Sequence, residues 1–234
     1  MSTTLPAASC AERSPRSAAA LLKSAFLALV ALAAPAHAGE RGAEPGDFDF
    51  YVLALSWSPS YCAAEGADAN AEQCGARRPF AFVVHGLWPQ YERGYPEFCP
   101  SRQPDRVPRA LTEAYRDVVP SAGLMGHQWR KHGSCSGLSQ TDYFSHLREA
   151  REQIAIPSAF SRLEGPRTVS PEEVEERFLA ENPELDPSGI AVTCDRRYLR
   201  EVRICMTRDL EFRACEEVDS KACRQRSVLM PPAR

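Results

Sequence analysis

The sequence has few lysines and no excess of positive charge. Three of its 28 basic residues are lysines, and the formal net charge of the 234-residue chain is −3. A protein that holds nucleic acid non-specifically through charge alone would be basic. The composition therefore excludes a general polyanion-binding surface, and any polyanion must be bound at a local site.

The sequence also lacks an apolar run long enough to cross a membrane. The run SAFLALVALAAPA (24–36) has 13 residues, whereas a transmembrane helix needs about 20. Basic residues precede this run and the small-residue pattern Ala36-His37-Ala38 follows it, which is the layout of a secretory signal peptide. We therefore expect residues 1–38 to be removed and the mature chain to be periplasmic or secreted, with no membrane contact.

No two cysteines form a CxxC pair, which disfavours a structural zinc site. Cleavage would leave eight cysteines, and an even set in an oxidising compartment indicates four disulfides. They are Cys62, Cys74, Cys99, Cys135, Cys194, Cys205, Cys215 and Cys223. Roughly a hundred pairings are possible, and the spacing alone does not select one.

The order of apolar patterns indicates a single α+β domain over 48–234, preceded by a flexible segment over 39–47. Strands are expected near both ends and helices between them. At the C-terminal end, 198–207 and 210–215 alternate apolar and polar residues and predict a β-hairpin. Cys205 would then face the second strand of this hairpin.

Two strands are expected in the first half of the chain. The apolar run 48–57 is rich in aromatic and β-branched residues and predicts a buried strand. The cysteine-bracketed segment 62–74 is small and polar and predicts a loop. A second strand over 79–89 would stop at its glycine and proline, leaving His85 at the strand end.

Three segments in the middle of the chain have helical spacing: 108–119, 141–154 and 170–183. Thr141 is the expected N-cap of the second. Ser170 is the expected N-cap of the third, with a glutamate three positions later that completes a capping box.

The stretch GHQWRKHGSCSG (126–137) concentrates polar side chains that can carry chemistry. On a helix over 126–135, residues three and four apart share a face. The side chains on that face would be His127, Gln128, Lys131 and His132. Three kinds of chemistry could use such a face.

The first is metal binding by both histidines and Cys135, but the pattern departs from H-E-x-x-H and the lysine would repel a cation. The second is a cysteine nucleophile in GSCSG, but an exported cysteine in an even set is expected in a disulfide. The third is metal-free phosphoryl transfer on RNA. There, histidines serve as base and acid, and a fixed ammonium such as Lys131 stabilises the developing charge.

That third reaction needs an acid on the far side of the phosphorus. VVHGLWPQ (83–90) supplies His85, and Trp88 could stack on a base. HGLWPQ (85–90) and HQWRKHGSC (127–135) closely resemble the two signature segments of the ribonuclease T2 family, which usually read H-G-L-W-P and H-E-W-x-K-H-G-T-C.

The resemblance implies an α+β fold with an antiparallel sheet flanked by helices. It implies a monomeric endoribonuclease that acts on RNA and not on DNA, with no cofactor, no metal and weak base preference. RNA would be cleaved through a 2′,3′-cyclic phosphate to a 3′-phosphate. Among the motif residues, His132 resembles the general base, His85 the general acid, His127 the phosphate-binding histidine and Lys131 the transition-state stabiliser. Trp88 resembles the base-binding aromatic residue, with Tyr95 as a looser candidate.

The resemblance also implies the disulfides Cys99–Cys135, Cys194–Cys223 and Cys205–Cys215, which leaves Cys62–Cys74 by elimination. Three positions in or beside the motifs depart from the family pattern, and the smallest change is Ser134 in place of threonine. Gln128 stands where glutamate is usual, and Gln90 replaces a frequent acidic residue at the substrate site. An amide can donate a hydrogen bond to a phosphoryl oxygen but cannot titrate. We therefore expect retained activity with an altered pH profile. The alternative is an exported RNA-binding protein whose catalysis is weakened or lost at Gln128.

Overall fold

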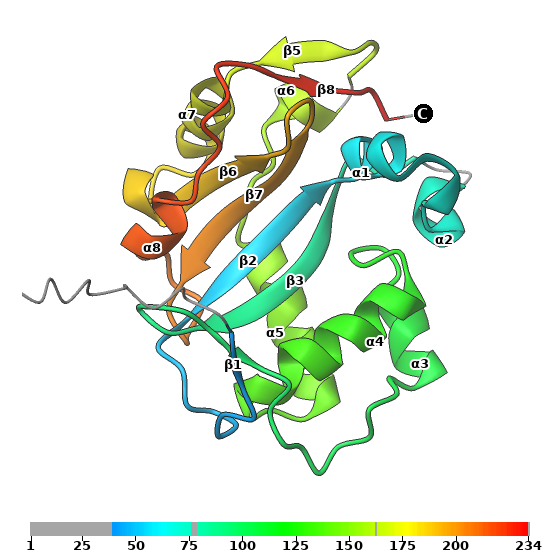
Figure 1. Ribbon diagram of the computed structural model, residues 1–234, viewed down its shortest axis with the longest axis vertical. Helices are drawn as coiled ribbons and strands as arrows, with labels where there is room; N and C mark the ends of the chain where they lie inside the picture. The colour runs from blue at the N-terminus through cyan, green and yellow to red at the C-terminus, as the bar shows by residue number, and fades with distance from the viewer. Residues whose placement is uncertain (1–38, 76–78, 162, 234) are drawn as a thin grey trace, which may run out of the picture. The chain divides into compact units, whose positions relative to one another are not determined.

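The computed structural model describes residues 39–75, 79–161 and 163–233 (Figure 1). The expected signal peptide and its cleavage site lie outside these residues. The centre of the fold is an antiparallel sheet of four strands in the order β3-β2-β7-β6. Its strands are β2 (Phe50–Trp57), β3 (Phe82–Gln90), β6 (Ile190–Cys194) and β7 (Leu199–Met206). The α+β prediction with an antiparallel sheet is confirmed.

Two small sheets and a set of helices surround this sheet. A parallel pair joins β1 (Glu40–Arg41) to β4 (Pro96–Glu97), and an antiparallel pair joins β5 (Arg167–Val169) to β8 (Val228–Met230). The α-helices are α1 (Ser58–Glu65), α2 (Ala71–Cys74), α3 (Arg109–Ala114), α4 (Ala122–Lys131), α5 (Gln140–Glu152), α6 (Ser158–Ser161), α7 (Pro171–Glu181) and α8 (Glu216–Asp219).

The main core lies on one face of the sheet. Side chains of a strand point to opposite faces in turn, so alternate residues of β2 lie on this face. These residues, Leu53, Leu55 and Trp57, are fully buried. Phe144 of α5 and Phe178 of α7 are buried in the same cluster. Burial of each such side chain contributes about 1.5–3 kcal/mol. The opposite face of β2 carries small residues on the side of the candidate active site.

The second strand begins at Phe82, later than expected, and does not stop at its glycine. β3 continues through Gly86 and Pro89 to Gln90, so the expectation that His85 ends the strand is wrong. β3 is an edge strand, where a proline that cannot donate a ladder hydrogen bond is tolerated. His85 therefore lies in the middle of a strand.

Two other expectations about local structure are also wrong. The segment 62–74 is mostly helical rather than a loop, because Asn70 caps α2 by accepting hydrogen bonds from two backbone N–H groups. The segment 210–215 forms one isolated bridge, Met206 to Phe212, and not a strand. The partner of β7 on that side is β6, a five-residue apolar run that the sequence reading missed.

The helices are confirmed with changed bounds. Of 108–119, only α3 is helical, and the Val118 carbonyl beyond it accepts a hydrogen bond from Val84 of β3 at 2.9 Å. Ser139, not Thr141, caps α5 by accepting from the backbone of residue 142. Ser170 caps α7 as expected.

The capping box at α7 is only half formed. The backbone N–H of Glu173 donates to Ser170, but the Glu173 carboxylate accepts hydrogen bonds from Arg167 and Arg177. Because the Glu173 carboxylate forms ion pairs with these two arginines, it does not reach back to the backbone N–H of the cap residue.

The segment 39–47, expected to be flexible, is held against the body of the domain. The N–H of Glu40 donates to Tyr95, that of Gly42 to Glu97, and that of Gly46 to Cys135. Within the described part of the chain, no helix combines the length and the apolar character needed to cross a membrane.

Candidate active site

His85 occupies a β-bulge in β3. Ala54 of β2 pairs with Gly86 and the next residue, Leu55, pairs with Val84, so His85 is the extra residue. Bulges redirect side chains and locally bend a strand. Here the bulge lets Val84 and Leu87, three positions apart, both face the core. His85 and Trp88, also three apart, contact each other with ring centroids separated by 5.3 Å.

The second motif lies at the C-terminal end of α4. The helix starts at the N-cap Ser121, whose hydroxyl accepts from the N–H of Leu124, and Met125 and Trp129 attach it to the core. It ends at Lys131 and not at residue 135 as expected, because His132 leaves helical geometry with φ −121° and ψ −48°. A 3₁₀ turn follows over Gly133–Ser136. The side chain of His132 therefore leaves the backbone in a different direction from the side chains of the helical residues before it.

Trp88 joins the two motifs. Its indole lies 5.3 Å from the His132 ring in a stacked arrangement, and it contacts His85 on the other motif. The indole Nε1–H donates to Oε1 of Gln128 at 2.7 Å. This bond passes directly over Gly86, where a Cβ would lie 2.2 Å from the indole nitrogen and 2.3 Å from the amide oxygen. Only glycine fits at that position.

His132 is surrounded so that its neutral form is favoured. It is 6% exposed, and its Nδ1 is buried without a hydrogen-bond partner among the described residues. Burial, with the nearby charges of Lys131, His85 and His127, holds the pKa of His132 well below its usual value. His127 is more exposed, and partial burial and Lys131 lower its pKa as well.

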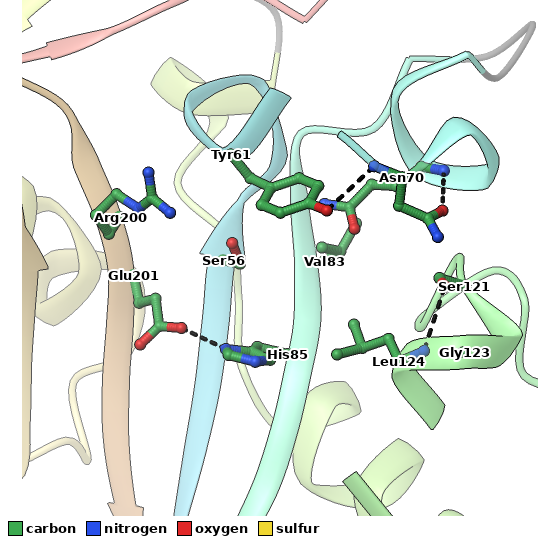
Figure 2. A pocket seen from close by; sticks show the side chains of 11 residues that line it. Ser56, Tyr61, Asn70, Val83, His85, Ser121, Gly123, Leu124, Arg200 and Glu201 are labelled. Carbon is green, nitrogen blue, oxygen red and sulfur yellow. Dashed lines mark hydrogen bonds and ion pairs between the residues drawn. The ribbon is translucent and has the colours of Figure 1, made fainter. Parts of the chain in front are cut away.

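His85 has a carboxylate partner that the sequence did not reveal. Its Nδ1 lies 2.5 Å from Oε1 of Glu201, which comes from β7 (Figure 2). Burial alone would raise the pKa of Glu201, but the hydrogen bonds and charges of His85 and Arg203 outweigh it and lower this pKa to about 2. The expected β-alternation around 198–207 was the available signal, since it places Glu201 and Arg203 on one face.

Lys131 also has an unforeseen partner. Its Nζ lies 3.6 Å from Oε2 of Glu97, and the other oxygen of that carboxylate accepts from Arg41 at 3.1 Å. The ammonium lies 5.7 Å from the ring centre of Tyr95, which is 6.2 Å from the His132 ring. The structure thus brings Tyr95 to the helical half of the site.

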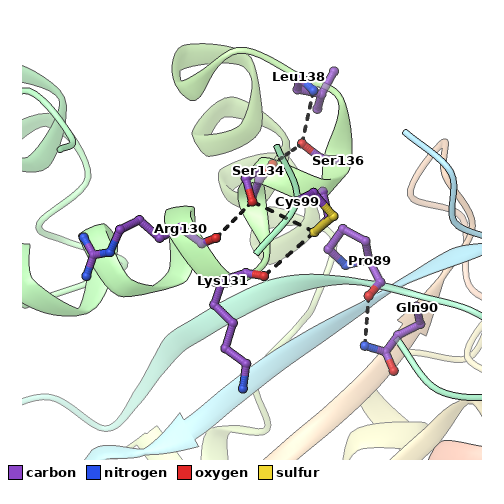
Figure 3. The surroundings of a disulfide bond; sticks show 10 residues. Pro89, Gln90, Cys99, Arg130, Lys131, Ser134, Ser136 and Leu138 are labelled. Carbon is purple, nitrogen blue, oxygen red and sulfur yellow. Dashed lines mark hydrogen bonds between the residues drawn. A yellow bond between two sulfur atoms is a disulfide. The ribbon is translucent and has the colours of Figure 1, made fainter. Parts of the chain in front are cut away.

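Gln90, the last residue of β3, directly follows the first motif. Its amide donates to the carbonyl of Pro89 at 3.0 Å, near the end of β3 (Figure 3). The side chain is half-buried. No recorded interaction of Gln90 within the described residues reaches either motif histidine.

The Cys99–Cys135 disulfide fastens the 3₁₀ turn after α4 to the chain beyond β4 (Figure 3). The other disulfides join Cys62 to Cys74, Cys194 to Cys223 and Cys205 to Cys215. These are the four expected pairs. Because Cys135 is oxidised, it offers no thiolate to a metal or to a substrate.

A pocket of about 390 Å³ opens beside the His85–Glu201 pair (Figure 2). It is bounded by the α1–α2 region, the start of α4 and strand β7. Its wall includes Ser56, Tyr61, Asn70, Ser121, Leu124 and Arg200. His85 and Glu201 both line this pocket, so a group bound there would lie beside His85.

Comparisons with known proteins agree with this geometry. A sequence model of the Ribonuclease T2 family matches residues 48–215. A "Ribonuclease" of Aeromonas hydrophila is 37% identical over 181 residues, covering 71% of this chain and 75% of that protein. The solved structure of an RNase-related protein from Calystegia sepium matches with a TM-score of 0.64 at 20% identity, covering 80% of this chain and 98% of that one. RNase NT in complex with 5′-AMP matches with a TM-score of 0.60, also at 20% identity, covering 80% of this chain and 99% of that one.

At this identity the two structures show a shared fold. The family match and the Aeromonas relative show more: the chain belongs to the ribonuclease T2 family of RNA endonucleases.

Proposed function

We propose that this protein cleaves single-stranded RNA by metal-independent transesterification, forming a 2′,3′-cyclic phosphate that is then hydrolysed to a 3′-phosphate, with low base specificity. The observation that carries the proposal is the pair of histidines on either side of Trp88. His85 contacts a carboxylate, whereas His132 is buried beside a lysine. Opposite surroundings of this kind separate an acid from a base.

In the first step, His132 takes the proton of the 2′-hydroxyl while the 2′-oxygen attacks phosphorus. His85 gives a proton to the departing 5′-oxygen as the P–O5′ bond breaks. Both transfers suit imidazoles, and the low pKa of His132 keeps this base unprotonated. In the second step, water replaces the 5′-hydroxyl and the two roles reverse.

The helical half of the site is assigned to stabilise the negative charge that develops on the phosphoryl oxygens. Lys131 supplies a fixed ammonium there. Its ion pair with Glu97 is long, at 3.6 Å, and leaves the ammonium able to interact with a phosphate. His127, exposed one helical turn before Lys131, is assigned to phosphate binding. These two side chains provide charge stabilisation without a Lewis acid.

Nucleobases are assigned to the aromatic side chains and to the pocket. The similar structure of RNase NT is a complex with a nucleotide, 5′-AMP. Trp88 and Tyr95 are both partly accessible, so a base can contact their rings. Gln90 is the weakest of the proposed substrate contacts, because its amide is already bonded to Pro89. The pocket beside His85 lies on the side where the 5′-oxygen leaves, and is therefore suited to the leaving nucleoside.

Gln128 does not by itself favour the alternative of an inactive RNA-binding protein. Its Oε1 accepts from Trp88, and a glutamate there could accept the same bond. The side chain is 2% exposed, so its first contribution is to hold the indole in place. An amide meets that need, and its NH₂ group remains a donor.

The decisive experiment incubates the mature chain with RNA or single-stranded DNA in the presence of EDTA. We expect RNA products with cyclic-phosphate ends, and intact DNA. Activity that disappears with EDTA, or that cuts DNA, would exclude this mechanism. Binding of RNA without cleavage would support the alternative.

We also propose that residues 1–38 are a signal peptide cleaved after Ala38, and that 48–234 form the ribonuclease domain of an exported monomer. The four disulfides support folding in an oxidising compartment. N-terminal sequencing of the exported protein, and its molar mass by light scattering, test the two parts separately.

A further inference from the structure

We propose that Glu201 is a positioning residue for His85: its carboxylate fixes the proton on Nδ1, aims Nε2 at the substrate and stabilises the imidazolium before proton transfer. The proposal rests on the assignment of His85 as the general acid. It adds a residue from β7, outside both sequence motifs.

The geometry leaves one ring nitrogen of His85 available. Nδ1 lies 2.5 Å from Oε1 of Glu201, and a carboxylate can only accept. Nδ1 therefore carries a proton in either charge state of the ring, and Nε2 is the nitrogen that gains or loses one. The His85 side chain is 36% exposed and that of Glu201 is 11% exposed. The carboxylate occupies Nδ1, so Nε2 is the ring nitrogen left for a substrate.

The sheet is built to let these two side chains meet across an intervening strand. β2 lies between β7 and β3, and Ser56 of β2 pairs with Glu201 while Ala54 pairs with Arg203. Serine and alanine are small, so longer side chains from both neighbours can extend over them. The bulge at His85 turns the ring toward the same face.

A third residue holds the carboxylate itself. Oε2 of Glu201 accepts from Nε and Nη2 of Arg203 at 3.0 and 2.9 Å. The two oxygens of Glu201 therefore have separate partners, one cation and one imidazole. Charge-assisted bonds of this kind are strong and directional. The Arg203 guanidinium also lies 5.2 Å from the centre of the Trp88 ring, which fixes its own position.

The proton balance follows from this arrangement. When the P–O5′ bond breaks, the proton on Nε2 of His85 passes to the 5′-oxygen and the ring becomes neutral with Nδ1–H still bonded to Glu201. Glu201 takes no proton at any stage. The low pKa of this carboxyl, about 2, agrees with a group that stays ionised throughout.

Other charges near His85 come from different elements and do not replace Glu201. Arg203 on β7, His127 on α4 and His132 just after α4 are cationic or can become so. They all oppose a positive ring. Glu201 is the one carboxylate recorded in contact with His85 within the described residues.

The test compares Glu201→Gln, Glu201→Asp and His85→Ala on two substrates. One is a dinucleoside phosphate, whose alkoxide leaving group needs an acid. The other is uridine 3′-(4-nitrophenyl phosphate), whose phenolate leaves without one. We expect Glu201→Gln to lower kcat on the first by on the order of 10- to 100-fold, less than the 10²- to 10⁴-fold expected for His85→Ala.

Three further results would identify positioning rather than a structural role. On the dinucleoside, KM should change little, and the alkaline limb of the pH–rate curve should move to lower pH in Glu201→Gln. On the aryl ester, Glu201→Gln and His85→Ala should both approach wild-type rates. Glu201→Asp should recover part of the loss. Equal losses on both substrates, or a wild-type pH profile, would overturn the proposal.

The two proposals fail in different ways. If His85→Ala is as slow on the aryl ester as on the dinucleoside, the acid assignment of His85 is wrong. If His85→Ala is rescued but Glu201→Gln behaves like wild type, only the positioning role is wrong. Should Glu201→Gln not fold, ¹⁵N NMR of the wild-type ring decides: neutral His85 must be protonated on Nδ1, and the Nε2–H tautomer would refute the proposal.

Discussion

The two halves of the site use the same side chain in opposite surroundings. On the sheet side, His85 is partly open to solvent and contacts the Glu201 carboxylate. On the helix side, His132 is buried, its Nδ1 has no recorded partner, and Lys131 stands one residue before it. A carboxylate favours a charged imidazole, whereas burial beside a cation favours a neutral one.

In the proposed mechanism, this difference would let one chain prepare an acid and a base from two identical side chains. His85 lies in a β-bulge of β3, and His132 lies where the backbone leaves helical geometry after α4. The sheet contributes a neighbour two strands away, and the helix contributes its last turn and the burial that follows it. Trp88 touches both rings, so it fixes their separation without making them alike.

The largest expected effect comes from removing either histidine. His85→Ala and His132→Ala should each lower kcat on RNA by on the order of 10²–10⁴. His146→Ala on α5 is the matched control, because that ring lies beside Glu149 outside the site, and it should leave kcat unchanged. Steady-state assays on a dinucleoside phosphate give the values. Near-wild-type activity in either of the first two variants would break the comparison.

Replacing Lys131 with methionine should have the next largest effect, on the order of 10²–10³ in kcat. Lys131 lowers the pKa of His132, so its loss should raise that pKa and move the acid limb of the pH–rate curve to higher pH. The pH profile checks the sign. Lys221→Met is the control, since Lys221 pairs with Glu217 near α8. An unshifted acid limb would mean that Lys131 does not tune the base.

Opening the Cys99–Cys135 bond by a double alanine replacement should cost about 4 kcal/mol of unfolding free energy, and opening Cys62–Cys74 about 3 kcal/mol, given loops of 36 and 12 residues. The activities should differ more than the stabilities. Only the first bond anchors the turn that follows His132. Denaturant unfolding and kcat, measured on both variants, test this, and equal activities would contradict it.

The smallest effects are expected at Gln128. Gln128→Glu keeps an acceptor for Trp88 and should change kcat within about tenfold, while its charge moves the acid limb to higher pH. Gln128→Leu leaves the indole N–H unpaired and should cost about 1–3 kcal/mol of stability. Thermal unfolding separates the two. If the leucine variant is as stable as wild type, the bond between Trp88 and Gln128 does not hold the site.

Local patterns in the sequence were enough for much of this architecture. The apolar run rich in aromatic and β-branched residues predicted the buried strand β2, and the cap Ser170 predicted the beginning of α7, because both depend on neighbours in the chain. The two motifs supplied the family. The continuation of β3 past His85 was missed, because the tolerance of Pro89 within the strand depends on β3 being an edge strand, which is a property of the assembled sheet.

The partners of the site residues could not be predicted in the same way. Glu201 is 116 residues from His85, and Glu97 is 34 residues before Lys131, so no local period connects them. The bulge at His85 appears only when β3 is aligned with β2. Each of these facts needs the register of one segment against another.

The sequence by itself therefore determined the family, the candidate histidines and lysine, and the even set of cysteines, since each depends on residue identity and short spacing. The tertiary structure alone decided which carboxylate stands behind which cation, how far each imidazole is buried, and where the bulge directs His85. Burial and electrostatic fields belong to the packed chain, because they depend on what other segments bring within a few ångströms of each group.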